Sequence, residues 1–112
     1  MSVERQEHDG LLCELADVLE QRLAADPETS YVARLHAGGL DCILRKLGEE
    51  SLELILAARD DDHEQIVREA ADLWFHSLVL LTRFGLRPEQ VIDELGRRFG
   101  LSGLDEKAAR KC

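Results

Sequence analysis

Two clusters of carboxylates occur inside strongly apolar helical segments of this sequence. The first has the sequence EESLE at residues 49–53, and the second has the sequence EAAD at residues 69–72. Residues three or four positions apart share one face of a helix, so Glu50 should lie beside Glu53, and Glu69 beside Asp72. Isoleucine and leucine residues border both acidic faces, although acidic faces of helices normally meet water. This pattern indicates a chemical role for the acids.

The two acidic faces can meet if the segments pack as an antiparallel pair. Carboxylates about 4 Å apart repel by roughly 4 kcal/mol at an effective dielectric constant of about 20. A hard divalent cation removes this repulsion, because Mg²⁺ takes oxygen ligands and retains waters for a phosphate substrate. We therefore predict a Mg²⁺ site, also open to Mn²⁺, with Glu50, Glu53, Glu69 and Asp72 as ligands. A ligand set without histidine favours these ions over zinc.

Neighbouring polar residues have two interpretations each. Glu49, at the edge of the first cluster, could serve a second ion or orient a water molecule. Lys46 lies one turn before Glu50 and could form an ion pair or contact a phosphate. His76 lies one turn beyond the second cluster and could be a hydrogen-bonded core residue or a substrate contact. Gly48 costs about 1 kcal/mol relative to Ala inside a helix, which indicates close approach of another backbone there.

Composition excludes several classes of protein. The chain has 112 residues, which suits a single domain over 1–112, and it carries 23 acidic against 14 Lys and Arg residues, a net charge of −9. This charge argues against binding nucleic acid or an anionic membrane. The three cysteines, Cys13, Cys42 and Cys112, are odd in number, which favours a reduced, cytoplasmic setting. The N-terminal residues lack the apolar stretch of a signal peptide, and no segment is apolar enough to span a bilayer.

Apolar periodicity and helix boundary signals predict an all-α domain. We expect helices over about 7–25, 40–59, 63–84 and 88–99, a short helix or turn over about 30–36, and a basic tail over 101–112. Asp62 and Gln65 resemble a capping box for the third long helix. The long helices carry more apolar surface than one small helical bundle of four to five helices can bury. We therefore predict a homodimer or higher homo-oligomer that completes the bundle.

The acid pattern E-E-x-x-E followed by E-x-x-D is similar to that of the all-α nucleotide pyrophosphohydrolases, the MazG-like superfamily. Within that group the chain resembles phosphoribosyl-ATP pyrophosphohydrolase of histidine biosynthesis. The matching stretches are TSY at 29–31, ILRKLGEE at 43–50, EAADLWFH at 69–76 and SGLDEKAAR at 102–110. Leu47 stands where that family often has Val, and Trp74-Phe75 where it usually has Leu-Tyr. Neither difference affects an expected metal ligand.

The resemblance implies Mg²⁺-dependent hydrolysis of 1-(5-phosphoribosyl)-ATP to 1-(5-phosphoribosyl)-AMP and pyrophosphate in the cytoplasm. At the site expected from the residues, a spare carboxylate could take the proton of the attacking water, and Glu49 is our choice for this role. Lys46, Lys107 and Arg110 are the candidates for phosphate contacts, and the alternative for the two cations of the tail is that they are merely solvated. The full set of expected substrate-binding residues is Ser30, Tyr31, Lys46, His76, Lys107 and Arg110.

Two alternatives remain at this point. The first is a house-cleaning hydrolase of non-standard nucleoside triphosphates in the same superfamily. The second is a non-catalytic helical dimerisation module whose acids are merely solvated. The module predicts no thermal stabilisation by Mg²⁺, whereas an enzyme that binds the ion is stabilised by it.

Overall fold

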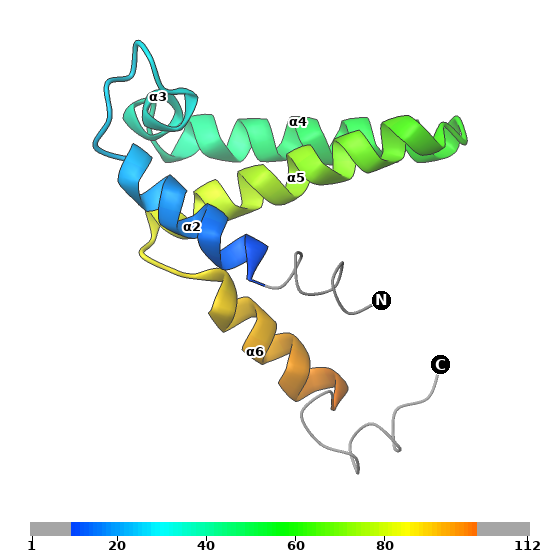
Figure 1. Cartoon of the computed structure of the whole chain (residues 1–112). Coiled ribbons are helices and arrows are strands. Elements are labelled where there is room, and N and C mark those ends of the chain that lie inside the picture. The colour runs from blue at the N-terminus through cyan, green and yellow to red at the C-terminus, as the bar shows by residue number, and fades with distance from the viewer. Residues whose placement is uncertain (1–9, 101–112) are drawn as a thin grey trace.

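The computed structural model describes residues 10–100, and every regular element in this range is a helix (Figure 1). This confirms the predicted all-α class. The three helices expected over 40–59, 63–84 and 88–99 occur within one residue of their predicted bounds. The elements are α2 (Leu11–Arg22), α3 (Tyr31–Ala37), α4 (Leu40–Arg59), α5 (His63–Arg83) and α6 (Pro88–Phe99).

Helix α2 is shorter than the segment 7–25 predicted from the sequence. Gly10 has a φ of 78°, and this left-handed conformation is incompatible with a continuous helix. At the other end, the Ala25 N–H bonds the Arg22 carbonyl in a tight turn. Leu23 lies beyond the helix but still packs against the core, which explains why apolar periodicity overestimated the helix. Residues 7–9, where the sequence predicts the start of this helix, and the predicted basic tail over 101–112 lie outside the described residues.

Helices α4 and α5 form a long antiparallel pair, which Figure 1 shows in green. Asp60 and Asp61 make the turn between them, and Asp61 takes a left-handed φ of 54°. The Asp62 side chain then accepts a hydrogen bond from the Gln65 N–H at 3.2 Å and caps α5. Only this half of the expected capping box forms, because the Asp62 N–H already bonds the Ala57 carbonyl. The tight turn places the two acidic segments opposite each other.

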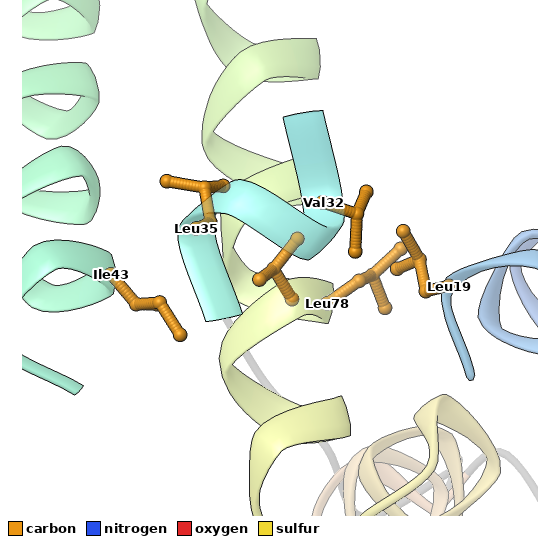
Figure 2. Packing of buried hydrophobic residues seen from close by; sticks show 6 residues of the cluster. Leu19, Val32, Leu35, Ile43 and Leu78 are labelled. Carbon is orange, nitrogen blue, oxygen red and sulfur yellow. The ribbon is translucent and has the colours of Figure 1, made fainter. Parts of the chain in front are cut away.

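The core lies where the first turns of α4 and the last turns of α5 meet α2 and α3 (Figure 2). Burial of these side chains holds the short α3 against the α4–α5 pair, since apolar burial stabilises in proportion to the area removed from water. The buried cluster consists of Leu19, Val32, Leu35, Ile43, Leu78 and Val79.

The far part of the α4–α5 pair extends beyond this core. The molecule measures 50 × 34 × 30 Å, with a radius of gyration of 16.5 Å. A compact chain of this length would have a radius of about 13 Å. Six large apolar side chains on this pair are exposed, and Trp74 has 62% of its surface accessible; the six are Leu44, Leu52, Ile55, Leu56, Val67 and Trp74. Among the described helices, none is long and apolar enough to cross a membrane.

Gly48 contradicts one expectation from the sequence. Among the residues that the structure describes, a Cβ built at this position meets no atom within 4 Å apart from the neighbouring backbone of its own helix. Gly48 is exposed on α4, so the predicted close approach of another backbone is wrong for this part of the chain.

Candidate active site

Three of the predicted metal ligands converge between α4 and α5. Glu50 comes from α4, and Glu69 and Asp72 come from α5. One carboxylate oxygen from each lies within 4.8 Å of the corresponding oxygens of the other two. Glu50 is 6% exposed and Glu69 is 8% exposed, whereas Asp72 reaches the surface. The site is therefore a partly buried acidic cluster that opens to solvent at Asp72.

Each buried carboxylate has one oxygen held by the protein and one without a partner. Gln65 Nε2 donates to Glu69 Oε2 at 2.6 Å, and Lys46 Nζ lies 3.6 Å from Glu50 Oε1. The remaining oxygens, Glu50 Oε2 and Glu69 Oε1, are buried and have no hydrogen-bond partner among residues 10–100. Unpartnered buried acceptors are costly, and a divalent cation with oxygen ligands is the group that this donor set fits. The residues present therefore suit the expected Mg²⁺.

Glu53 borders the group of three without joining it. The neighbouring carboxylate of Glu69, followed by the charge of Glu50, raises the pKa of Glu53 to about 7. Glu53 is exposed at the open edge of the site. The acids are thus close enough that one of them retains a proton near neutral pH when no cation is bound. This is the behaviour expected of carboxylates that share one site.

Lys46 places one positive charge beside the acids. Its ammonium lies 3.5 Å from Glu49 Oε1 as well as 3.6 Å from Glu50 Oε1. The nearby Tyr31, Glu50 and Glu49 raise the pKa of Lys46, although partial desolvation opposes them. The ion pair considered from the sequence therefore forms. A third of the Lys46 side chain remains exposed, so the ammonium can still meet a substrate.

The first turn of α3 brings Tyr31 to the same site. Ser30 is buried and caps this helix, its hydroxyl accepting a hydrogen bond from the Ala33 N–H at 3.2 Å. Tyr31 follows at once, and its hydroxyl lies 2.8 Å from His76 Nε2. The other ring nitrogen of His76, Nδ1, lies 2.8 Å from the backbone carbonyl of Asp72. His76 is a hydrogen-bonded core residue, 5% exposed, and its contact with substrate stays a prediction.

Three further residues contribute to the site and were missed in the sequence. Gln65 holds Glu69, and its position four residues earlier on the same helix is a signal that could have identified it. Phe75 stacks with Tyr31 at a centroid separation of 6.3 Å, and the Arg34 guanidinium lies 5.8 Å from the centre of the Tyr31 ring. Of these two contacts of Tyr31, only the one with Arg34, within α3, has a sequence spacing that could have suggested it.

An apolar cavity lies apart from these acids. It has a volume of about 460 Å³ between α2, α5 and α6. Trp74, Leu81 and Ile92 are among its lining residues, and none of the predicted site residues lines it. The cavity therefore takes no part in the candidate active site.

Comparison with known proteins identifies the family. A family model described as phosphoribosyl-ATP pyrophosphohydrolase matches residues 12–99. The chain belongs to this family. The matched region contains both acid clusters, together with Tyr31, Lys46 and His76. The chain is therefore an enzyme of a hydrolase family, as the resemblance implied.

Two relatives cover most of the chain. The phosphoribosyl-ATP pyrophosphatase of Methylococcus capsulatus is 56% identical over 101 residues, which are 90% of this chain and 96% of that protein. The phosphoribosyl-ATP pyrophosphatase of Methylibium petroleiphilum is 57% identical over 103 residues, which are 92% of this chain and 86% of that protein. The expected phosphate contacts Lys107 and Arg110 lie beyond the region matched by the family model and outside the described residues.

Proposed function

We propose that this chain hydrolyses phosphoribosyl-ATP to phosphoribosyl-AMP and pyrophosphate, a step of histidine biosynthesis. Membership of the family and the names of both relatives support this substrate. The structural observation that supports it most is the pair of buried, unpartnered oxygens of Glu50 and Glu69 on facing helices. A solvated acidic face would not bury such atoms.

Mg²⁺, with Mn²⁺ as a substitute, is the proposed cofactor, held by Glu50, Glu53, Glu69 and Asp72. When bound, it supplies positive charge that offsets the charge developing on the phosphate oxygens and a place for the attacking water. The protein prepares this ligand set in advance. Gln65 fixes one oxygen of Glu69, so that the other remains directed into the cluster.

The remaining residues bind the substrate and move a proton. Glu49 is the proposed base for the attacking water, since its carboxylate is half exposed next to the cluster. Lys46 contacts the substrate phosphates from the same turn of α4. Lys107 and Arg110 add phosphate contacts, and Ser30, Tyr31 and His76 form the wall of the substrate site on the side of α3.

The proposed working form is a homodimer or higher homo-oligomer in the cytoplasm. The exposed Leu52, Ile55, Val67 and Trp74 provide the apolar surface that another copy would cover. Cys13 and Cys42 are both free thiols, in keeping with a reducing compartment. Light scattering at micromolar concentration tests the assembly, and a monomeric mass would contradict it.

Pyrophosphate release from phosphoribosyl-ATP tests the activity. EDTA should stop the release, because the charge on the phosphate oxygens is then no longer offset. Added Mg²⁺ should restore it. Glu53→Gln should lose turnover while its helical circular dichroism spectrum is unchanged. The matched control is Glu64→Gln, an exposed acid on α5 that pairs only with Arg68 among the described ion pairs. Equal turnover by both variants would contradict the ligand assignment.

The same assay separates the alternatives. A house-cleaning hydrolase would release pyrophosphate faster from members of a panel of deoxynucleoside triphosphates than from phosphoribosyl-ATP. A non-catalytic module would turn over neither substrate and would show no thermal shift with Mg²⁺.

A further inference from the structure

Gln65 lies in the first turn of α5, where its side chain bonds a proposed metal ligand instead of completing the helix cap. The Asp62 side chain accepts a hydrogen bond from the Gln65 N–H at 3.2 Å, which is one half of a capping box. The other half would join the Asp62 N–H to the Gln65 side chain, but that N–H bonds the Ala57 carbonyl at 3.2 Å. The Gln65 carboxamide is therefore free of the cap, and it reaches Glu69 one turn further along α5.

This contact determines how the two oxygens of Glu69 can be used. An ionised carboxylate only accepts hydrogen bonds, so the amide nitrogen of Gln65 is the atom that faces it. Gln65 Nε2 donates to Glu69 Oε2 at 2.6 Å, and a hydrogen bond to a charged acceptor is about twice as strong as one between neutral groups. Glu69 Oε1 is buried and has no hydrogen-bond partner in the part of the chain that the structure describes. Glu69 therefore offers one oxygen to a cation.

Glu50 on the facing helix is arranged in the same way. Its Oε1 lies 3.6 Å from the Lys46 ammonium, whereas its Oε2 is buried and likewise unpartnered among the described residues. The Lys46 restraint is the looser one, because its ammonium is shared with Glu49 and a third of its side chain is exposed. The hydrogen bond from Gln65 is thus the firmer restraint on the buried carboxylates.

Divalent cations differ in how they use carboxylates. Ca²⁺ takes about six to eight oxygen ligands in flexible geometry and often binds both oxygens of one carboxylate, whereas Mg²⁺ requires octahedral geometry with shorter bonds and retains water molecules. Both oxygens of Glu69 can meet one cation only if the bond from Gln65 breaks. That change would leave the amide donor of the half-buried Gln65 without its acceptor, which costs free energy. A Glu69 limited to one oxygen therefore suits Mg²⁺ better than Ca²⁺.

We propose that Gln65 is a specificity-determining residue that favours Mg²⁺ over Ca²⁺ at the acidic cluster. The inference rests on the proposed function, in which Glu69 is a ligand of Mg²⁺. It also gives the half-formed cap a role. The turn that places α5 against α4 takes up the Asp62 N–H, and this leaves the Gln65 amide available for Glu69.

Gln65→Met tests the proposal, because methionine has a similar length and helix propensity but no hydrogen to donate. Mg²⁺ and Ca²⁺ are titrated separately into substrate-free protein by isothermal titration calorimetry. The readout is the Kd for Ca²⁺ divided by the Kd for Mg²⁺. This ratio should fall about tenfold in the variant, since removing a group that holds a metal ligand typically changes metal affinity by about ten- to a hundredfold. Gln65→Asn, whose amide is one methylene too short for the same bond, should shift the ratio in the same direction.

Gln90→Met is the matched control, because the Gln90 side chain also makes a hydrogen bond, with the Arg87 N–H at 2.8 Å, but on α6. Its ratio should equal that of the wild type. If Gln65→Met changes both dissociation constants by the same factor, or changes neither, the selective role is overturned while the proposed function stands. If wild-type protein binds neither ion and releases no pyrophosphate from phosphoribosyl-ATP in the presence of Mg²⁺, both are overturned.

Discussion

Glu69→Gln should stabilise the metal-free protein and at the same time remove its response to Mg²⁺. Glu50 and Glu69 are both buried, and their cluster oxygens lie within 4.8 Å of each other. Coulomb's law at that separation gives a repulsion of about 3.5 kcal/mol at an effective dielectric constant of about 20. Solvent at the open side of the cluster, where Asp72 is exposed, screens part of this repulsion, so we expect the free energy of unfolding to rise by about 1–2 kcal/mol. Glutamine can still accept the hydrogen bond from Gln65.

The order of stability should reverse when Mg²⁺ is added. At a concentration of 100 Kd, a bound ion stabilises the wild type by about 2.7 kcal/mol, whereas the variant lacks a charged ligand. For a domain of this size, each kcal/mol shifts the melting temperature by about 4 °C or more. Thermal melts by circular dichroism, with EDTA and with saturating Mg²⁺, measure both effects on the same samples.

Glu64→Gln on the same helix is the control for this measurement. Its carboxylate is 80% exposed and pairs with Arg68, so its removal should change stability by less than about 0.5 kcal/mol and leave the Mg²⁺ shift intact. The reasoning is refuted if Glu69→Gln melts below the wild type in EDTA and retains the full Mg²⁺ shift. Glu69 would then be a stabilising partner of Gln65 and not a repelled metal ligand.

Three further predictions concern pH, helix propensity and the α2–α6 junction. Because the folded-state pKa of Glu53 is raised to about 7, its contribution to stability is complete below about pH 4.5 and is lost as the pH rises to 7. Urea unfolding in EDTA should show this decline, and saturating Mg²⁺ should remove it. Gly48→Ala should add about 1 kcal/mol to the free energy of unfolding, because position 48 lies inside a helix and has room for a methyl group. A loss of stability would indicate that a partner chain packs against this position. Arg87→Met should lower the melting temperature, because Arg87 Nη1 lies 2.9 Å from both Asp17 and Glu20 of α2. An unchanged melting temperature would show that these two ion pairs do not contribute to stability.

The sequence was sufficient to predict most of the fold because helix signals are local. Gly85, Pro88 and Gly100 mark boundaries that the structure reproduces, and the turn of three aspartates separates α4 from α5. Apolar periodicity alone could not end α2 correctly. Leu23 is packed against the core from a turn, and a buried side chain in a turn looks the same in a sequence as one in a helix.

The acid cluster could be predicted for a related reason, because spacing on each helix and a short turn between them leave few ways to pair the two faces. The contact between Tyr31 and His76 could not, since it joins residues 45 positions apart on elements whose relative placement depends on the whole core. The Ser30 cap, in contrast, is local and could be considered from the sequence, because its hydroxyl accepts from the Ala33 N–H three residues later.

Diffraction from crystals soaked in Mn²⁺ can show whether the facing carboxylates of α4 and α5 share one cation, because the anomalous signal locates the ion without reference to activity. We expect a peak between α4 and α5, with oxygens of Glu50, Glu69 and Asp72 about 2 Å from it and Glu53 as the fourth ligand. A fully occupied peak elsewhere, such as at the Asp60–Asp62 turn, with none between these three carboxylates, would contradict it.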